Sequence, residues 1–281
     1  MGKLHSEKKG SLQKLSSFFG YSRAAYYKSA KSERVVLDAN ESVRKLVQPI
    51  RRSQSKTGGK KIYQMIKGSL KELPVAMGRD KFFVALRAND MLVKRKRRFV
   101  KTTDSYHRFH KYKNRLKDAV ISKPHQAYVS DITYLRAGSK FIYLFLQMDA
   151  YSRVITGWDL SPSLGIEGAM RAMKMTIKQS PDTRGAIHHS DRGIQYCCGA
   201  YVKLAQKARM KISMTEQNHC YENAMAERLN GILKQEFLLD ETFADFKMAY
   251  KSVKEAVSIY NEQRLHWSLD LRTPMQVHKA A

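Results

Sequence analysis

Hydrophobic and polar positions alternate along the second half of the chain as they do in β-strands. Two short polar turns, at 137–139 and 150–152, separate three such stretches. Turns this short predict an antiparallel meander of three strands. The strands are expected at 127–134, 140–149 and 153–159.

The spacing of apolar residues becomes helical after residue 164. Ile166, Met170, Met173 and Ile177 fall on one stripe and predict a helix over 165–179. The order of elements that follows predicts an α/β fold: a ribonuclease-H-like mixed five-stranded sheet flanked by helices, with the first strand central and the fourth beside it. The later elements are strands at 185–189 and 211–214 and helices at 200–208, 224–237 and 243–260.

The first 93 residues show helical spacing only, which predicts a basic all-helical arm in front of the sheet. Residues 12–28 read as a helix, a turn at Gly20 and a second helix capped by Ser22, with Arg23 at its exposed start. In a helix-turn-helix this start reaches base edges or phosphates. An ordinary helical hairpin is the alternative.

Three more helical segments between residues 40 and 92 suit a winged or trihelical DNA-binding module. Five consecutive cations follow and read as a linker that adds salt-sensitive affinity for phosphates: Lys94, Arg95, Lys96, Arg97 and Arg98. The predicted domains are a helix-turn-helix-like hairpin (1–36), a helical DNA-binding module (37–93), a basic linker (94–126) and a catalytic core with a helical tail (127–281).

Charge is distributed unevenly along the 281 residues. Residues 1–126 carry 32 Lys/Arg against 9 Asp/Glu, a net charge of +23, and residues 127–281 carry 20 against 16. A basic N-terminal half joined to a nearly neutral C-terminal half indicates a nucleic-acid-binding region attached to a catalytic domain. A basic surface kept for solubility is the weaker explanation, because the bias is confined to one half.

Cysteine content and hydropathy indicate the cellular compartment in which the protein is expected. Three cysteines, Cys197, Cys198 and Cys220, make no disulfide framework and suit a reducing compartment. No apolar run approaches the roughly 18 residues of a membrane helix, and the N-terminus lacks the apolar region of a secretory signal. A cytoplasmic protein with no membrane partner is expected.

Three carboxylates occupy positions that the predicted fold brings together. Asp131 lies midway along the first strand, Asp191 just past the fourth, and Glu227 on a helix. Oxygen ligands of this kind suit two Mg²⁺ ions that carry out phosphodiester chemistry, with Mn²⁺ as a substitute. Lys234 and Asn230 lie on the same helix face as Glu227, where they could contact a phosphate and the substrate.

Each of these residues has an ordinary structural explanation when it is taken alone. Asp131 could form a turn, and Glu227 could face solvent, as most single carboxylates do. The combination on matching elements, next to a basic arm, favours the metal site. A zinc site at His188 and His189 lacks the usual ligand spacing; one of these histidines is expected in the core, with the other orienting the site.

Several longer strings occur in the predicted core and its tail: DITY at 131–134, DAYSR at 149–153, HSDRGIQY at 189–196, CYENAMAE at 220–227 and YNEQRLHWSL at 260–269, followed by Thr273-Pro274. Together these strings resemble the integrase core of OrfB-type bacterial insertion-sequence transposases. Departures from the family pattern, such as Arg228 after Glu227, remove none of the three carboxylates.

The resemblance implies a DDE recombinase that nicks element ends and joins the 3′-hydroxyl to a target strand. It places Asp131, Asp191 and Glu227 on the metal-binding triad and Lys234 on a downstream basic position. It also implies double-stranded DNA as the substrate, a homo-oligomer on DNA, and an OrfA product or an OrfAB fusion as a partner.

Two rival functions are compatible with the same sequence. Without an OrfA partner, the chain could be a non-catalytic DNA-binding regulator of transposition. It could also be another ribonuclease-H-like nuclease, although such enzymes need neither strand joining nor a long basic arm. Metal-dependent nicking and joining of an element end distinguishes all three.

Overall fold

The computed structural model describes residues 11–73, 75, 77–93, 110–216 and 223–281. The chain divides into two compact units, one formed by residues 1–52 and 57–94 and the other by residues 53–56 and 95–281. In the part of the chain that is described, no helix combines the length and the apolar character needed to cross a membrane.

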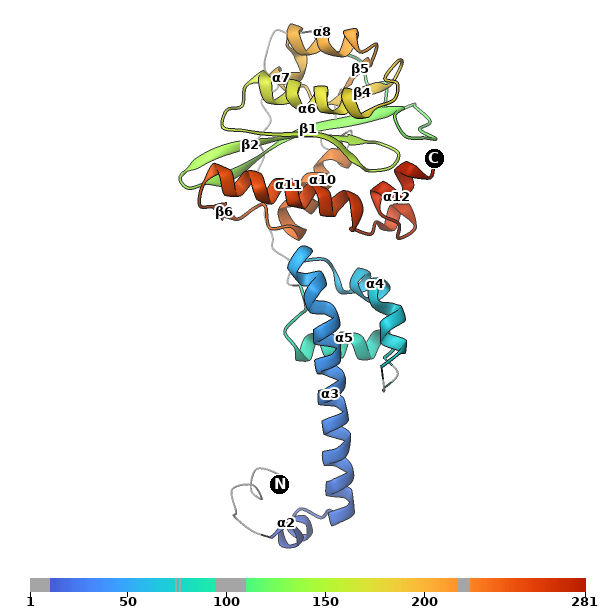
Figure 1. The fold of residues 1–281 in the computed structure, drawn as a ribbon, viewed down its shortest axis with the longest axis vertical. Coiled ribbons are helices and arrows are strands. Elements are labelled where there is room, and N and C mark those ends of the chain that lie inside the picture. Colours follow the sequence, from blue (N-terminus) through green and yellow to red (C-terminus); the bar gives the residue numbers. More distant parts are fainter. Residues whose placement is uncertain (1–10, 74, 76, 94–109, 217–222) are drawn as a thin grey trace. The chain divides into compact units, whose positions relative to one another are not determined.

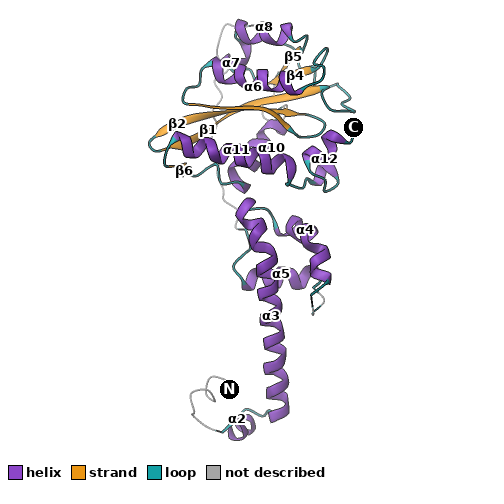
Figure 2. Ribbon diagram, viewed as in Figure 1, coloured by secondary structure: helices purple, strands orange, loops and turns teal. Residues whose placement is uncertain are grey.

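The described part of the N-terminal unit is helical (Figure 2). Ser22 caps the second helix as predicted, because its Oγ accepts a hydrogen bond from the Ala25 amide at 3.0 Å. That helix continues to Ser53, through the predicted boundary between residues 36 and 37, because no Gly or Pro interrupts it there. The helices are α2 (Leu12–Phe18), α3 (Arg23–Ser53), α4 (Gly59–Lys71) and α5 (Arg79–Ala88).

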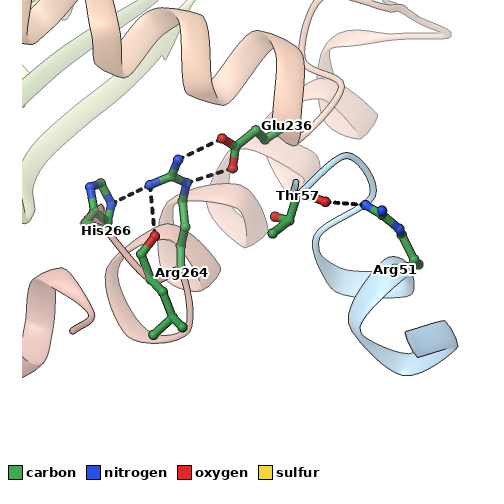
Figure 3. A network of polar contacts seen from close by, with 6 residues as sticks. Arg51, Thr57, Glu236, Arg264 and His266 are labelled. Carbon is green, nitrogen blue, oxygen red and sulfur yellow. Dashed lines mark hydrogen bonds and ion pairs between the residues drawn. The ribbon is translucent and has the colours of Figure 1, made fainter. Parts of the chain in front are cut away.

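A small apolar core joins the second half of α3 to α4 and α5. The loop after α3 is closed by Arg51, whose Nη1 donates to the carbonyl of Thr57 at 2.6 Å (Figure 3). The Nη2 of Arg51 donates to the carbonyl of Met91 at 2.9 Å. The three helices predicted between residues 40 and 92 are therefore confirmed as a packed group. The core consists of Val43, Val47, Ile62, Leu70, Phe82 and Leu86, with smaller neighbours.

The second unit is built on one mixed sheet with the strand order β3-β2-β1-β4-β5. This confirms the predicted meander, the central first strand and the fourth strand beside it. A sixth strand, β6 (Thr242–Phe243), pairs with the end of β1 and is too short to leave a sequence signal. The other strands are β1 (Ala127–Ala137), β2 (Lys140–Asp149), β3 (Ile155–Ser161), β4 (Ile187–Ser190) and β5 (Lys211–Met214).

Helices cover both faces of the sheet (Figure 1). Alternate residues of β1 explain the two layers: Tyr128 packs in the cluster with α6 and α8, and Val129 and Leu135 pack in the cluster with α10 and α11. The first layer holds α6 (Ile166–Gln179), α7 (Ile194–Cys197) and α8 (Gly199–Lys207); the second holds α10 (Ala224–Glu236), α11 (Phe246–Glu262) and a tail with η1 (Trp267–Leu269) and α12 (Pro274–Lys279).

Part of the predicted linker belongs to the core unit. Tyr112, Leu116 and Ile121 pack against the apolar clusters of the sheet. The Arg115 amide also donates to Ser213 Oγ at 2.8 Å. Residues 110–126 are therefore not a free connector, because their few apolar side chains have a surface to cover. The predicted phosphate-binding run 94–98 lies outside the described residues.

His188 is buried in the middle of this core, and its burial predicts acid sensitivity. Its Nε2 lies 2.8 Å from both Ser130 Oγ and Tyr201 Oη, and burial lowers its pKa from 6.5 to about 3. Because the unfolded chain takes up this proton near pH 6.5 and the folded chain does not, folding stability is fully present above pH 6.5. It falls between pH 6.5 and 3 by up to about 1.4 kcal/mol per pH unit.

The measurement is the urea midpoint of the wild-type chain and of His188→Gln at pH 7 and pH 5. We expect the wild type to lose more stability over this interval than the variant, whatever their absolute stabilities. Equal losses would contradict the assignment of a neutral, buried imidazole.

Candidate active site

Asp131 lies at a gap along one edge of the central strand. The parallel partner β4 pairs with β1 only as far as Val129, and β6 begins its pairing at Arg136. Val129 is opposite His189, so continuing the register by two residues brings Asp191 alongside Asp131. The parallel register is therefore the reason that two carboxylates 60 positions apart in sequence become neighbours.

A tight turn fixes Asp191 at the end of β4. Its Oδ1 accepts a hydrogen bond from the Gly193 amide at 2.9 Å. The strand stops at Ser190, whose side chain donates to the Asp191 carbonyl at 3.0 Å. Asp191 is thus held by its own backbone at the carboxyl end of a buried strand, where substrates commonly bind in α/β folds.

Two asparagines attach α10, which carries Glu227, to the central strand. Asn223 Nδ2 donates to the Ser130 carbonyl at 3.3 Å, and Asn230 Nδ2 donates to Asp131 Oδ2 at 2.6 Å. Glu227 lies between them in the first turn of α10. Asn223 was not singled out from the sequence; its place in the string at 220–227 and its position at the start of a predicted helix were the available signals.

The contact made by Asn230 differs from the one predicted. Its amide points at a carboxylate of the site, and its own Oδ1 is buried without a partner among the described atoms. Asn230 therefore orients Asp131 in this structure. Contact with substrate, which the helix face predicted, stays a prediction for this residue.

The carboxylates repel one another. Burial, together with the negative charges of Asp191 and Glu227, raises the pKa of Asp131 to about 7. The Ile132 amide, which donates to Asp131 Oδ1 at 2.9 Å, and the Lys234 ammonium act in the opposite direction. Partial burial also raises the pKa of Glu227. Such crowding of like charges is typical of sites that hold cations.

Lys234 is held over an aromatic ring near this group. Its Nζ lies 4.4 Å from the centroid of the Tyr134 ring. Burial lowers the pKa of Lys234, whereas the charges of Asp131 and Asp240 raise it. The side chain is therefore a partly buried ammonium at the carboxylates, two turns along α10 from Glu227.

The donor set suits a hard cation, although the described residues do not form a closed cage. Asp131, Asp191 and Glu227 offer only carboxylate oxygens, the ligand type that Mg²⁺ prefers. Among the described residues, no three His, Cys, Asp or Glu side chains converge around one point. The three carboxylates are close enough for Asp191 and Glu227 to act on Asp131 electrostatically, but in this structure they are not gathered around one point.

The histidines and cysteines near the site have structural surroundings. His188 and His189 are both buried, and His189 Nδ1 lies 2.9 Å from Ser213 Oγ. His188 contacts Ser130, the neighbour of Asp131. Both histidines are thus core residues, and the orienting role predicted for one of them stays a prediction. Cys197 and Cys198 are free thiols, and Cys220 lies outside the described residues.

The remaining predicted DNA contacts belong to the N-terminal half. Arg23 is the exposed first residue of α3, as the sequence predicts. Its contact with DNA stays a prediction. The same holds for Lys94, Arg95, Lys96, Arg97 and Arg98, which the structure does not describe.

Comparison with known proteins identifies the class of the core unit. Two family models, both described as integrase core domain, match residues 121–220 and 208–274, so this part of the chain is an integrase core. Among solved structures, the chain is similar to the HTLV-2 integrase catalytic core domain in complex with magnesium (16% identity, TM-score 0.45, covering 56% of this chain and 97% of that one).

Similar curated proteins come from insertion elements. The insertion element IS600 uncharacterized 31 kDa protein of Shigella sonnei is 30% identical over 91% of this chain and 94% of its own length. Transposase InsF for insertion sequence IS3A of Escherichia coli (strain K12) is 31% identical over 65% of this chain, which spans 64% of the length of InsF.

The chain belongs to the family of insertion-sequence transposases with an integrase core. Its reaction class is that of a DNA polynucleotidyl transferase. This confirms the family, the fold and the enzyme class that the sequence predicts.

Proposed function

We propose that this chain nicks DNA at the ends of an insertion sequence and joins the 3′-hydroxyl to target DNA, with Asp131, Asp191 and Glu227 as its catalytic carboxylates. The observation that carries the proposal is the parallel register of β1 and β4, which sets Asp191 beside Asp131. The 2.6 Å hydrogen bond from Asn230 to Asp131 supports it, because this bond attaches the helix of Glu227 to the same strand.

The three carboxylates would hold a pair of Mg²⁺ ions, or Mn²⁺ in their place. Bound there, such ions activate the attacking oxygen and neutralise the leaving oxygen of a phosphodiester. The protein's part is to present the ligands in fixed positions. The Ile132 amide and the Asn230 amide occupy one oxygen each of Asp131, and the Gly193 amide orients Asp191.

The other parts of the chain would hold the DNA. Lys234 supplies a positive charge next to the carboxylates, suited to a phosphate that flanks the scissile bond. The helical N-terminal unit, through Arg23, and the basic run 94–98 that follows it would bind the DNA of the element ends. A homo-oligomer that pairs two ends, an OrfA product or OrfAB fusion as a partner, and a cytoplasmic location complete the proposal.

The test is an assay of the purified full-length chain on duplex oligonucleotides that carry the element's terminal repeat. We expect nicked and joined products with Mg²⁺ or Mn²⁺ and none with EDTA. Binding without any cleavage, with and without an added OrfA product, would favour a DNA-binding regulator. Hydrolysis without joining would favour another nuclease of the same fold.

Lys234 gives a second test of the same site. We expect Lys234→Gln to slow product formation by about 10-fold to 100-fold, because a charge-assisted contact to phosphate contributes roughly 1.5–3 kcal/mol. The matched control is Lys251→Gln on the exposed side of α11, which should stay within about twofold of wild type. The same loss in both variants would contradict a specific role for Lys234.

A further inference from the structure

A second charged feature lies at the other end of the parallel strands. A hollow of about 870 Å³ is lined by the start of β4, by the connector before β1 and by the C-terminal helix α12. Ile187, the first residue of β4, is part of its wall, and Asp191 follows the last. Asp191 is four positions after Ile187, a span of roughly 13 Å at about 3.3 Å per residue.

The lining of this hollow is strongly basic. Arg115, Lys123, Arg184 and Lys211 line it and are exposed, and they come from three separate segments. The one acidic residue in the lining, Asp182, is paired with Arg184 at 2.8 Å. Two of the four cations come from the basic segment before residue 127 and two from the nearly balanced segment 127–281, so the fold brings together cations that are far apart in the sequence.

Two histidines lie in the wall of this hollow and contact each other. The rings of His125 and His278 lie 4.7 Å apart, edge to face. His278 Nδ1 is 2.9 Å from Ser152 Oγ, and His125 Nδ1 is 2.8 Å from Tyr128 Oη. The buried carboxylate of Asp149 accepts hydrogen bonds from the Ser152 hydroxyl at 2.9 Å and from the His125 amide at 2.7 Å. These contacts join the connector before β1, the turn after β2 and α12 at the wall of the hollow.

We infer that this basic hollow binds the phosphate backbone of duplex DNA away from the scissile position. The inference rests on the proposed function, which makes DNA the substrate. An open hollow with separate cations around its rim suits successive phosphates of a backbone, because each cation can meet one phosphate and release one counterion. Its distance from Asp191 makes it a contact to flanking or second-duplex DNA.

The test measures duplex binding by the full-length chain in EDTA, so that no cleavage intervenes. We expect the double variant Lys123→Glu/Lys211→Glu to bind at least about 10-fold more weakly at moderate salt, with the slope of log K against log salt reduced by about 2. The matched control is Lys247→Glu/Lys251→Glu on exposed positions of α11, with the same change of charge. Equal weakening in both pairs would overturn the inference.

A residue-level readout separates this hollow from DNA contacts elsewhere in the chain. Lysine acetylation followed by mass spectrometry should show Lys123 and Lys211 protected by duplex DNA, and Lys247 and Lys251 unchanged. Unchanged labelling of Lys123 and Lys211 would overturn the inference, as would protection by inorganic tripolyphosphate alone. Nicking by the wild type, scored separately, tests the proposed function, so the two can fail independently.

Discussion

Replacing Asp131 with asparagine is expected to reduce nicking and strand transfer by about 10³-fold or more, with duplex DNA binding kept within about twofold. Loss of a metal-binding carboxylate removes several kcal/mol of transition-state stabilisation, and each 1.4 kcal/mol corresponds to a factor of ten in rate. Asparagine keeps the size of the side chain. The measurement is initial product formation on a terminal-repeat duplex with Mg²⁺.

The same substitution should stabilise the metal-free protein at alkaline pH. The pKa of Asp131 is raised from 3.8 to about 7, so stability is fully present below about pH 3.8 and is lost as the pH rises through 7. At pH 8 in EDTA, Asp131→Asn should therefore unfold at a higher urea concentration than wild type. Glu255→Gln, on the exposed side of α11, serves as the control. Full activity of Asp131→Asn would refute the proposed triad.

Arg264→Ala is expected to cost about 3–5 kcal/mol of folding stability, because removing one partner of a buried ion pair is strongly destabilising. Arg264 is 2% exposed, and its Nε and Nη2 donate to the two oxygens of Glu236 at 2.8 and 2.7 Å (Figure 3). Its Nη1 lies 2.8 Å from His266 Nε2. Since whole domains are stable by only about 5–15 kcal/mol, this is a large effect. Urea denaturation measures it.

An exposed ion pair of the same chemistry provides the control. Arg44 donates to both oxygens of Glu41, at 2.7 Å each, and the two side chains are 43% and 44% exposed. Arg44→Ala should cost far less stability than Arg264→Ala, because solvent screens an exposed pair. In Arg264→Ala combined with Glu236→Gln, the loss should be smaller than the sum of the two single losses. Equal effects at the buried and exposed pairs would contradict this account.

The contacts of Arg264 also give a structural reason for the string at 260–269, which the sequence identifies only through its resemblance to the transposase family. Glu236 is the last residue of α10, and Arg264 follows the end of α11. Their pairing fixes the C-terminal end of the helix that carries Lys234. Nothing in the spacing of residues 236 and 264 predicts this contact, because it depends on how two helices pack on one face of the sheet.

The sequence by itself determined the order of the elements and the identities of the candidate carboxylates. Alternation along 127–134, short turns and a helical stripe at 165–179 are local properties, so the strands and helices of the core could be predicted from them. The carboxylates could be identified because their residue type and their positions on predicted strands and a predicted helix can be read from the local sequence, without knowing their contacts.

Only the tertiary structure decided how those residues work together. The register between β1 and β4 sets Asp191 beside Asp131, and Asn230 turns from a predicted substrate contact into a support for Asp131. The connector at 110–126 joins the core, and with α12 it frames a basic hollow. These are contacts between segments far apart in the chain, and their energies come from burial and pairing that no local pattern records.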